Sequence, residues 1–509
     1  MELIKDTINI CETTAKGTAQ AMADSDVIVP DIKPDILKLL QVDSDACITD
    51  KYIENGKLII CGRIDYKILY VPDSEKEKIK SIATSTEFRQ AADGGGVDSD
   101  CKILAKPTVE RVEFNAVNSR KLRIRSIIHI DYEVCRVVEA CITSDADDES
   151  VEKRYEDICY ENTVDISEHD FTVKERIEIP SGESSVDEIL KTDVKIYDLE
   201  YKSVTGKVII KGSIGVCILY TDDDGEVKFT EAELPFTEVL DADGVNENTD
   251  CDIDCSILGT MCEAEPDTDG DMRVLSLDVD ISASLKGTQT CEDKVLQDCF
   301  VPYCKTECEK EDIKLCSAIE RPSAQNTIRE IIEFPQNVPE VSRVYNVMTN
   351  AVLTKSETQR NKIICEGKIE AYILYLTNSS ENPIYSFKKD IPFSYMIECK
   401  NDTEDVECEI KAVIKHISYS LTSGGELEIR CLLSLDCMLI KEMTLSNIAN
   451  IYADDINARK GIIIYFANEG ESVWDIAKRY AIPCESLAVY NEIEGDRVEK
   501  KRRLFIPAG

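Results

Sequence analysis

Cysteine is frequent in this chain, with 22 copies in 509 residues, and it is the residue type that most readily suggests metal binding or nucleophilic chemistry. The densest group comprises Cys291, Cys299, Cys304, Cys308 and Cys316. Structural zinc sites usually pair their ligands at short spacing, but this group offers one C-x3-C and no nearby histidine. Other cysteines lie in apolar stretches, where a thiol is a small buried hydrophobe. We therefore expect structural thiols, no metal site and no cofactor.

Sequence signatures of catalysis are absent. The three histidines, His129, His169 and His416, fall at non-equivalent places, and no H-E-x-x-H, G-x-S-x-G or P-loop pattern occurs. "DGGGV" at 93–97 lacks the Lys-Ser/Thr of a phosphate loop. "TDDDGEV" and "DTDGD" resemble parts of a calcium loop without its bidentate glutamate, so they predict hairpin turns. We expect no catalytic residues and no enzyme activity.

Basic and aromatic side chains near the C-terminus are the main candidates for binding a partner. From Arg459 the chain has nine Lys and Arg against eight Asp and Glu, so the rest carries about −41. The run "KKRR" at 500–503 suits an acidic protein partner, with a solvated turn as the alternative. Trp474, the only tryptophan, is expected either as a contact anchor or in ordinary core packing. The predicted partner-binding residues are Trp474, Lys478, Arg479, Lys501, Arg502 and Arg503.

A βααβ unit at 459–509 is predicted to position these side chains. A short strand at 462–467 precedes Ser472, which forms a helix-capping pattern with Asp475 three residues later. Apolar residues at helical spacing follow. Pro483 suits the first turn of a second helix, and "RLFIP" predicts a closing strand.

Three long repeats precede this unit. Their landmarks are Pro30, Pro180 and Pro335; Gly62, Gly212 and Gly367; Ile-Leu-Tyr at 68–70, 218–220 and 373–375; and Phe88, Phe236 and Phe393. Each glycine lies 32 residues after its proline. This constant spacing predicts three tandem domains of common ancestry, at 1–147, 148–303 and 304–455.

Within each repeat, alternating apolar and polar residues predict antiparallel strands. In "GRIDYKILY", the side chains of Ile64, Tyr66, Ile68 and Tyr70 share one face and are expected in the core. The predicted fold is mainly β: three tandem antiparallel β-sandwich or barrel-like domains and the small C-terminal unit. Short helices are expected at "PDILKLL" and "SVDEILKT". The acidic stretches 144–157 and 304–312 are expected as solvated links.

The net charge of −40 disfavours nucleic acid and anionic lipid as partners because both carry the same sign. The first residues lack the pattern of a secretion signal, and no stretch approaches the roughly 20 apolar residues that span a bilayer. We expect a cytoplasmic protein with no nucleic-acid partner and no membrane insertion.

The C-terminal unit resembles a LysM domain. The matching residues are Tyr465, Gly470, Ser472, Val473, Ile476, Ala477, Tyr480, Leu487, Asn491, Leu504, Ile506 and Pro507. LysM domains commonly bind N-acetylglucosamine polymers in a shallow groove. The resemblance implies a groove formed by Gly470, Glu471, Ser472, Val473, Asn491, Glu492 and Ile493. The sequence departs from the family at Glu471, where aspartate is usual, and at 500–503, where a glycine is replaced.

The three repeats followed by this unit resemble the SPOCS-domain and LysM family of spore-coat morphogenetic proteins. The resemblance implies a mother-cell protein at the forespore surface that tethers the coat to a basement-layer ATPase. In that family the LysM domain is understood to contact the ATPase, and other coat proteins are further partners.

Two functions remain open at this point. In the first, the chain is a non-enzymatic assembly scaffold whose three repeats present multivalent surfaces. In the second, the LysM-like unit binds peptidoglycan and delivers the β-domains to cell wall or spore cortex. A wall hydrolase is supported only by the LysM analogy. The missing secretion signal favours the scaffold.

Overall fold

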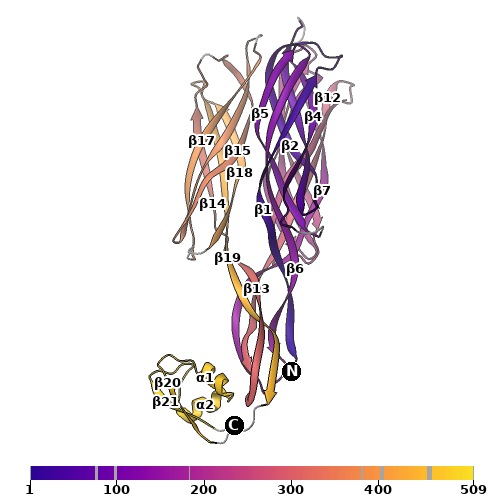
Figure 1. The fold of residues 1–509 in the computed structure, drawn as a ribbon. Helices are drawn as coiled ribbons and strands as arrows, with labels where there is room; N and C mark the ends of the chain where they lie inside the picture. The colour runs from indigo at the N-terminus through magenta and orange to yellow at the C-terminus, as the bar shows by residue number, and fades with distance from the viewer. Residues whose placement is uncertain are drawn as a thin grey trace.

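Long antiparallel strands make up most of the chain, and a small unit with two helices lies at one end (Figure 1). The computed structural model describes residues 2–74, 78–96, 100–180, 182, 184–336, 338–379, 382–401, 406–455 and 461–507. Among these residues, no helix has the length and apolar character needed to cross a membrane.

The first repeat forms two facing three-stranded sheets. Its strands are β1 (Leu3–Ile28), β2 (Ile36–Glu54), β3 (Lys57–Pro72), β4 (Lys80–Asp93), β5 (Lys102–Asn118) and β6 (Lys121–Ala146). One sheet has the order β1-β6-β5, and the other is the meander β2-β3-β4. Buried residues from both sheets, such as Ile60 and Ile124, share one core, so the repeat is a β-sandwich.

The second repeat has the same topology, with sheets β7-β12-β11 and β8-β9-β10. Its strands are β7 (Glu152–Glu178), β8 (Val186–Val204), β9 (Lys207–Asp222), β10 (Val227–Asp241), β11 (Asp250–Pro266) and β12 (Met272–Phe300). The turns predicted at "DDDGE" and "DTDGD" are confirmed, because Asp222 and Asp267 each accept backbone N–H bonds from within their own turns.

In the third repeat the first long strand is divided in two. The strands are β13 (Cys304–Glu320), β14 (Ser323–Ile332), β15 (Val341–Gln359), β16 (Lys362–Thr377), β17 (Ile384–Glu398), β18 (Glu407–Leu421) and β19 (Leu427–Asp455). Both β13 and β14 pair with β19, and Pro322 lies between them. Proline cannot donate to a strand ladder, which explains the break. The predicted fold of three tandem antiparallel β-domains is confirmed.

The repeated Ile-Leu-Tyr triplet is buried on both faces of its strand. Ile64, Tyr66, Ile68 and Tyr70 lie in the first sandwich core, at most 1% exposed, as predicted. The intervening Leu69 points the other way, into a core that it shares with Leu219 and Leu374 from the other two triplets. The outer faces of the three meanders therefore pack against one another, which joins the repeats into one body.

Each repeated glycine lies directly across the ladder from the repeated phenylalanine. The pairs are Gly62 with Phe88, Gly212 with Phe236 and Gly367 with Phe393. A Cβ atom on Gly62 would come within 2.3 Å of Phe88 Cζ. The aromatic ring therefore covers the glycine, an arrangement that fixes strand register.

The two predicted short helices are wrong, because both segments are the starts of strands. "PDILKLL" begins β2 and "SVDEILKT" begins β8. Register shifts between Ile36 and Lys38 and between Leu39 and Gln41 mark β-bulges, and β8 has shifts at the equivalent places. Each bulge adds a residue and disrupts the strict two-residue alternation. Apolar residues then recur three and four apart, as they do in a helix.

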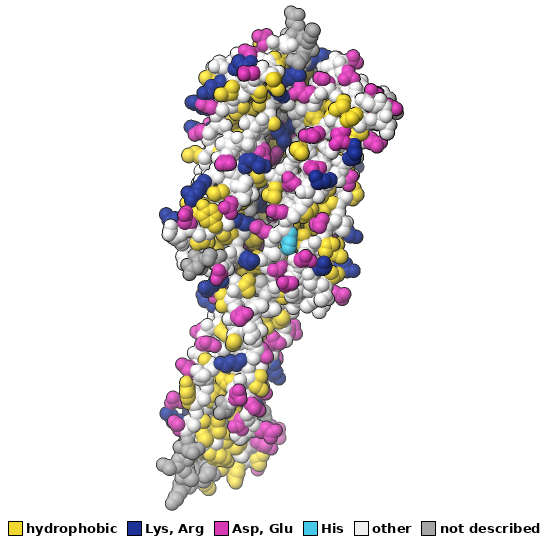
Figure 2. Space-filling model, turned by 90° about the vertical axis from the view of Figure 1, so that its right-hand side faces the viewer, with side chains coloured by type: hydrophobic (Ala, Val, Ile, Leu, Met, Phe, Trp, Pro, Cys, Tyr) yellow, Lys and Arg dark blue, Asp and Glu magenta, His cyan; other side chains and the backbone are white. Residues whose placement is uncertain are grey.

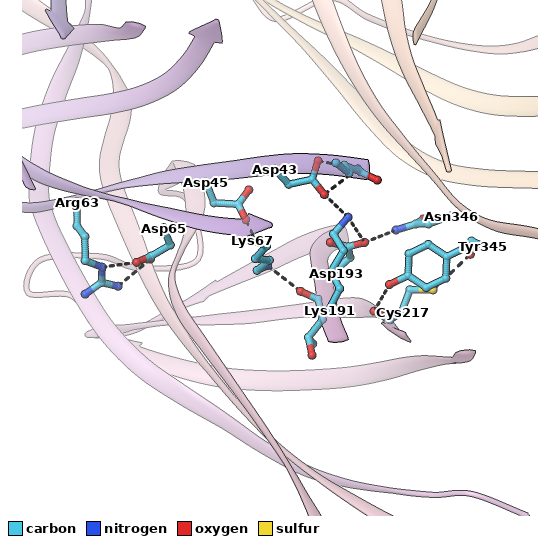
Figure 3. Close-up of polar contacts among 12 residues, drawn as sticks. Asp43, Asp45, Arg63, Asp65, Lys67, Lys191, Asp193, Cys217, Tyr345 and Asn346 are labelled. Atoms are coloured by element: carbon cyan, nitrogen blue, oxygen red, sulfur yellow. Dashed lines mark hydrogen bonds and ion pairs between the residues drawn. The ribbon is translucent and has the colours of Figure 1, made fainter. Parts of the chain in front are cut away.

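A buried polar cluster lies between the meanders (Figure 3). The Lys191 side chain is 2% exposed, and its ammonium contacts the carboxylates of Asp43 and Asp193. Asn346 Nδ2 donates to Asp193 at 3.2 Å, so residues from all three repeats meet here. Burial lowers the pKa of Lys191, but the carboxylates of Asp193 and Asp43 outweigh it and raise the pKa overall. The lysine is therefore held charged in the interior.

The first and last strands of each repeat extend beyond the sandwiches as two-stranded ribbons, which pack into a stalk (Figure 1). Ile8, Ile142, Ile158, Leu315 and Leu445 are among the residues of its apolar core. Further along the stalk, Asn447 accepts from Thr143 N at 2.8 Å and donates to the Cys141 carbonyl at 3.0 Å. These bonds tie the first ribbon to the third.

The expectation of solvated acidic links at 144–157 and 304–312 is correct only for 147–151, which connect β6 to β7. Residues 152–157 lie in β7 and residues 304–312 in β13, where they pair with β12 and β19. Acidic side chains alternate there with residues that pack in the stalk, such as Tyr155 and Cys308. Over the stalk and body, Asp and Glu are interspersed with Lys and Arg (Figure 2).

Candidate functional site

The C-terminal unit has the predicted βααβ order. It comprises β20 (Ile463–Ala467), α1 (Val473–Tyr480), α2 (Cys484–Asn491) and β21 (Arg502–Ile506). Ser472 caps α1, and its hydroxyl accepts a 3.4 Å hydrogen bond from Asp475 N. Val473, Ile476, Leu487 and Leu504 fill a small core between the helices and the two-stranded sheet.

Phe300, the last residue of β12, completes that core. It is 1% exposed and packs edge-on against Trp474, with ring centroids 5.1 Å apart. Two hydrogen bonds accompany it: Tyr303 N donates to the Ala481 carbonyl at 2.7 Å, and Cys484 N donates to the side-chain Oε1 of Glu152 at 3.2 Å. The unit is therefore seated on the base of the stalk, as Figure 1 shows.

Asp298 connects the stalk to α1. It accepts a 2.9 Å hydrogen bond from Trp474 Nε1 and pairs with the Lys478 ammonium. Burial raises the pKa of Asp298, but the hydrogen bonds from Lys478 and Trp474 outweigh it and lower the pKa overall. The ionised carboxylate is therefore favoured at this contact.

The six predicted partner-binding residues divide into two groups. Trp474 and Lys478 are half-buried against Asp298, and Arg502 donates to the Asn491 carbonyl within the unit. Lys501 and Arg503 are exposed, as is Arg479, which lies over the Tyr465 ring and donates to its hydroxyl. The structure thus leaves Arg479, Lys501 and Arg503 with their charges at the surface.

The outer face of the β20–β21 sheet carries an apolar group that the sequence reasoning missed. Ile464 pairs with Phe505 and Phe466 pairs with Arg503 across the ladder. Ile464 is 51% exposed, Phe466 64% and Phe505 49%. The sequence did contain a signal for this face. Residues at alternate positions of a strand face opposite sides, so Ile464, Phe466 and Phe505 must point away from the side of Tyr465 and Leu504. We call Ile464, Phe466, Arg503 and Phe505 the outer sheet face.

Two family models match the chain. One, described as "SipL, SPOCS domain", matches residues 35–117, 185–265 and 340–422, and the other, described as "LysM domain", matches 468–507. The chain is a SPOCS-domain and LysM-domain protein. No curated protein and no solved structure matches it. Each SPOCS match covers the meander and the following strand of a repeat, from β2 to β5 in the first.

The SipL family connects this SPOCS and LysM protein with sporulation and the spore coat. SPOCS and LysM domains are binding domains, so the findings fit a scaffold or a cell-wall binder. Among the described residues, no group of three or more His, Cys, Asp or Glu side chains could hold a metal ion.

The residues predicted to form a glycan groove lie in two segments of the LysM domain. Val473 is in its core, and the buried Asn491 donates to the Leu487 and Phe505 carbonyls and accepts from Phe505 N. These two residues hold the domain together. Gly470 and Glu492 are exposed, while Glu471, Ser472 and Ile493 are half-buried.

The loop before α1 is paired with a later segment. Gly470 N donates to the Val498 carbonyl at 2.8 Å, and Val473 N donates to the Asp496 carbonyl at 2.9 Å. A small open pocket lies beside this pairing, lined by Glu492, Ile493, Glu494, Val498, Glu499, Lys500 and Arg502. Only Glu492 and Ile493 of the predicted groove line it.

Proposed function

We propose that the chain is a non-enzymatic assembly scaffold of the spore coat, held at the forespore surface of the mother cell. In this proposal its LysM domain binds the coat basement-layer ATPase, and its SPOCS repeats present surfaces to other coat proteins. The observation that carries the proposal is the outer sheet face, where three exposed apolar side chains lie beside Arg503. Exposed apolar groups rimmed by charge are typical of protein-binding sites.

Charge supports an acidic protein as the occupant. Arg503 lies within the outer sheet face and Lys501 precedes β21, while the rest of the chain is strongly acidic. A basic patch on such a chain attracts an acidic partner and helps to orient the two proteins as they associate. Trp474 and Lys478 are already engaged with Asp298, so the proposed docking residues are the outer sheet face together with Arg479 and Lys501.

Co-purification of the full chain with the ATPase tests this proposal. We expect Lys501→Glu with Arg503→Glu to weaken association at least tenfold and to reduce its dependence on salt. Phe466→Ser should also weaken it, without the change in salt dependence. Lys305→Glu with Lys355→Glu, at exposed sites on strands of the third repeat, is the matched control. Unchanged association in both test variants would refute the docking surface.

Peptidoglycan binding is the second candidate, because LysM is a peptidoglycan-binding family. Its test is co-sedimentation of the full chain with purified peptidoglycan and with chitin. Saturable binding that is lost in Ile493→Asp and retained in Phe466→Ser would support the wall-binding function. Retention of the ATPase without sedimentation supports the scaffold.

A further inference from the structure

Two thiols are in contact where the second repeat passes into the third. Cys299 is the penultimate residue of β12 and Cys308 lies in β13, and their sulfur atoms are 3.7 Å apart. The Cys299 side chain is fully buried, whereas Cys308 is half-buried. The S–S bond of a disulfide is about 2.05 Å long, so the two sulfur atoms must approach each other by about 1.7 Å to bond.

The surroundings favour a reactive sulfur at Cys308. The thiol hydrogen bond with Cys299 lowers the pKa of Cys308, and the nearby Lys478 cation assists this shift. Burial and the Asp298 carboxylate oppose it. The hydrogen bond with Cys308 and burial raise the pKa of Cys299. Cys308 is therefore the more readily ionised of the two thiols, and the thiolate is the nucleophilic form of cysteine.

We propose that Cys299 and Cys308 are a peroxide-reactive pair that closes into a disulfide between β12 and β13. The Cys308 thiolate attacks one oxygen of hydrogen peroxide, the O–O bond breaks, and a sulfenic acid and hydroxide form. Cys299 sulfur then attacks the sulfenic sulfur, the S–O bond breaks, and its proton leaves with the hydroxyl group as water. Overall, two thiols are oxidised and one peroxide is reduced to two waters.

The disulfide would form directly beneath the LysM domain. Cys299 follows Asp298, which binds Trp474 and Lys478, and precedes Phe300, which packs in the LysM core. Oxidation therefore links the strand that supports the LysM domain covalently to the first strand of the third repeat. The inference does not depend on which partner the LysM domain binds.

Peptide mapping of the full chain after hydrogen peroxide treatment tests the pair. Free thiols are blocked with N-ethylmaleimide, and the protein is digested without reductant using trypsin and chymotrypsin, which separate Cys299 from Cys304. We expect a Cys299–Cys308 linked peptide, lighter by two hydrogen atoms than its two thiol peptides. Its yield should be at least tenfold above that in the untreated protein. It should persist in Cys304→Ser and be absent from Cys308→Ser.

A second variant resolves the order of steps. In Cys299→Ser, no thiol at position 299 can attack the sulfenic acid of Cys308. Dimedone, which reacts with sulfenic acids, should therefore label Cys308 more strongly than in the wild type. The exposed Cys141 serves as the internal reference for oxidant exposure. Recovery of Cys308 as its maleimide adduct in the wild type, under conditions that oxidise Cys141, would overturn the proposal.

Discussion

Trp474 Nε1 donates a 2.9 Å hydrogen bond to Oδ2 of Asp298, a residue 176 positions earlier in the chain. This bond and the adjacent Lys478 ion pair join the LysM domain to the last strand of the second SPOCS repeat. Because Trp474 is the only tryptophan, its fluorescence reports directly on that contact.

Asp298→Ala is expected to loosen the LysM domain from the stalk. It removes the acceptor of both Trp474 and Lys478, which corresponds to about 1.5–3 kcal/mol for a hydrogen bond to a charged group. The tryptophan emission maximum should shift to longer wavelength as water reaches the indole. Asp6→Ala, at an exposed position of the neighbouring ribbon, should leave the emission unchanged. Equal spectra for both variants would contradict the contact.

The same contact should weaken in acid. Because the folded-state pKa of Asp298 lies below its ordinary value, the stabilisation is complete above the unfolded pKa of about 3.9. It is lost as the pH falls through the lower folded-state pKa. Tryptophan emission titrated downward from pH 6 should stay constant to about pH 4 and then shift. In Asp298→Asn this transition should be reduced, and an identical titration would show that another group controls it.

Alanine at the three repeated glycines should destabilise the repeats to different degrees. A Cβ at Gly62 or Gly367 meets both a phenylalanine ring and a backbone carbonyl oxygen at 2.5 Å, whereas at Gly212 the carbonyl is 3.3 Å away. We expect losses of about 1–3 kcal/mol from overpacking, smallest for Gly212→Ala. Urea denaturation of each full-length variant measures them. Gly182→Ala meets nothing within 4 Å and is the control.

Lys191→Met should destabilise the packing of the repeats against one another. The substitution leaves the carboxylates of Asp43 and Asp193 near each other without the buried cation, and breaking a buried ion pair costs about 3–5 kcal/mol. The urea midpoint should fall accordingly. Adding Asp43→Asn and Asp193→Asn to Lys191→Met should recover part of the loss, because the unpaired charges are then gone. Failure of this recovery would assign the loss to packing alone.

Local sequence patterns predicted the individual repeats of this protein better than the contacts between the repeats. The alternation through Tyr66 predicted the core face of its strand correctly, because the two-residue period depends only on neighbours along the chain. The pairing of Gly62 with Phe88 across the ladder was not predicted, although both served as landmarks of the repeat. Leu69 was not recognised as a contact between repeats, since alternation alone assigns it to the surface. Its burial depends on two other copies of the same triplet.

At the candidate site, too, contacts between distant segments were not predicted from the sequence. The capping pattern at Ser472 and the LysM-like residues predicted the domain. Asp298 and Phe300, which seat it, lie in a distant strand and no local pattern connects them to Trp474. The bulges in β2 produced helical spacing in a strand, so periodicity alone assigned the wrong element there.

The stalk also sets a length. The strand β12 has 29 residues and runs from the sandwich to the LysM domain, and at roughly 3.3 Å per residue it spans about 90 Å. The LysM domain and the far ends of the sandwiches lie at opposite ends of the molecule (Figure 1). The length of this strand therefore sets the distance between the LysM domain and the far ends of the sandwiches. In the scaffold proposed above, it would also set the spacing between the two sets of partners.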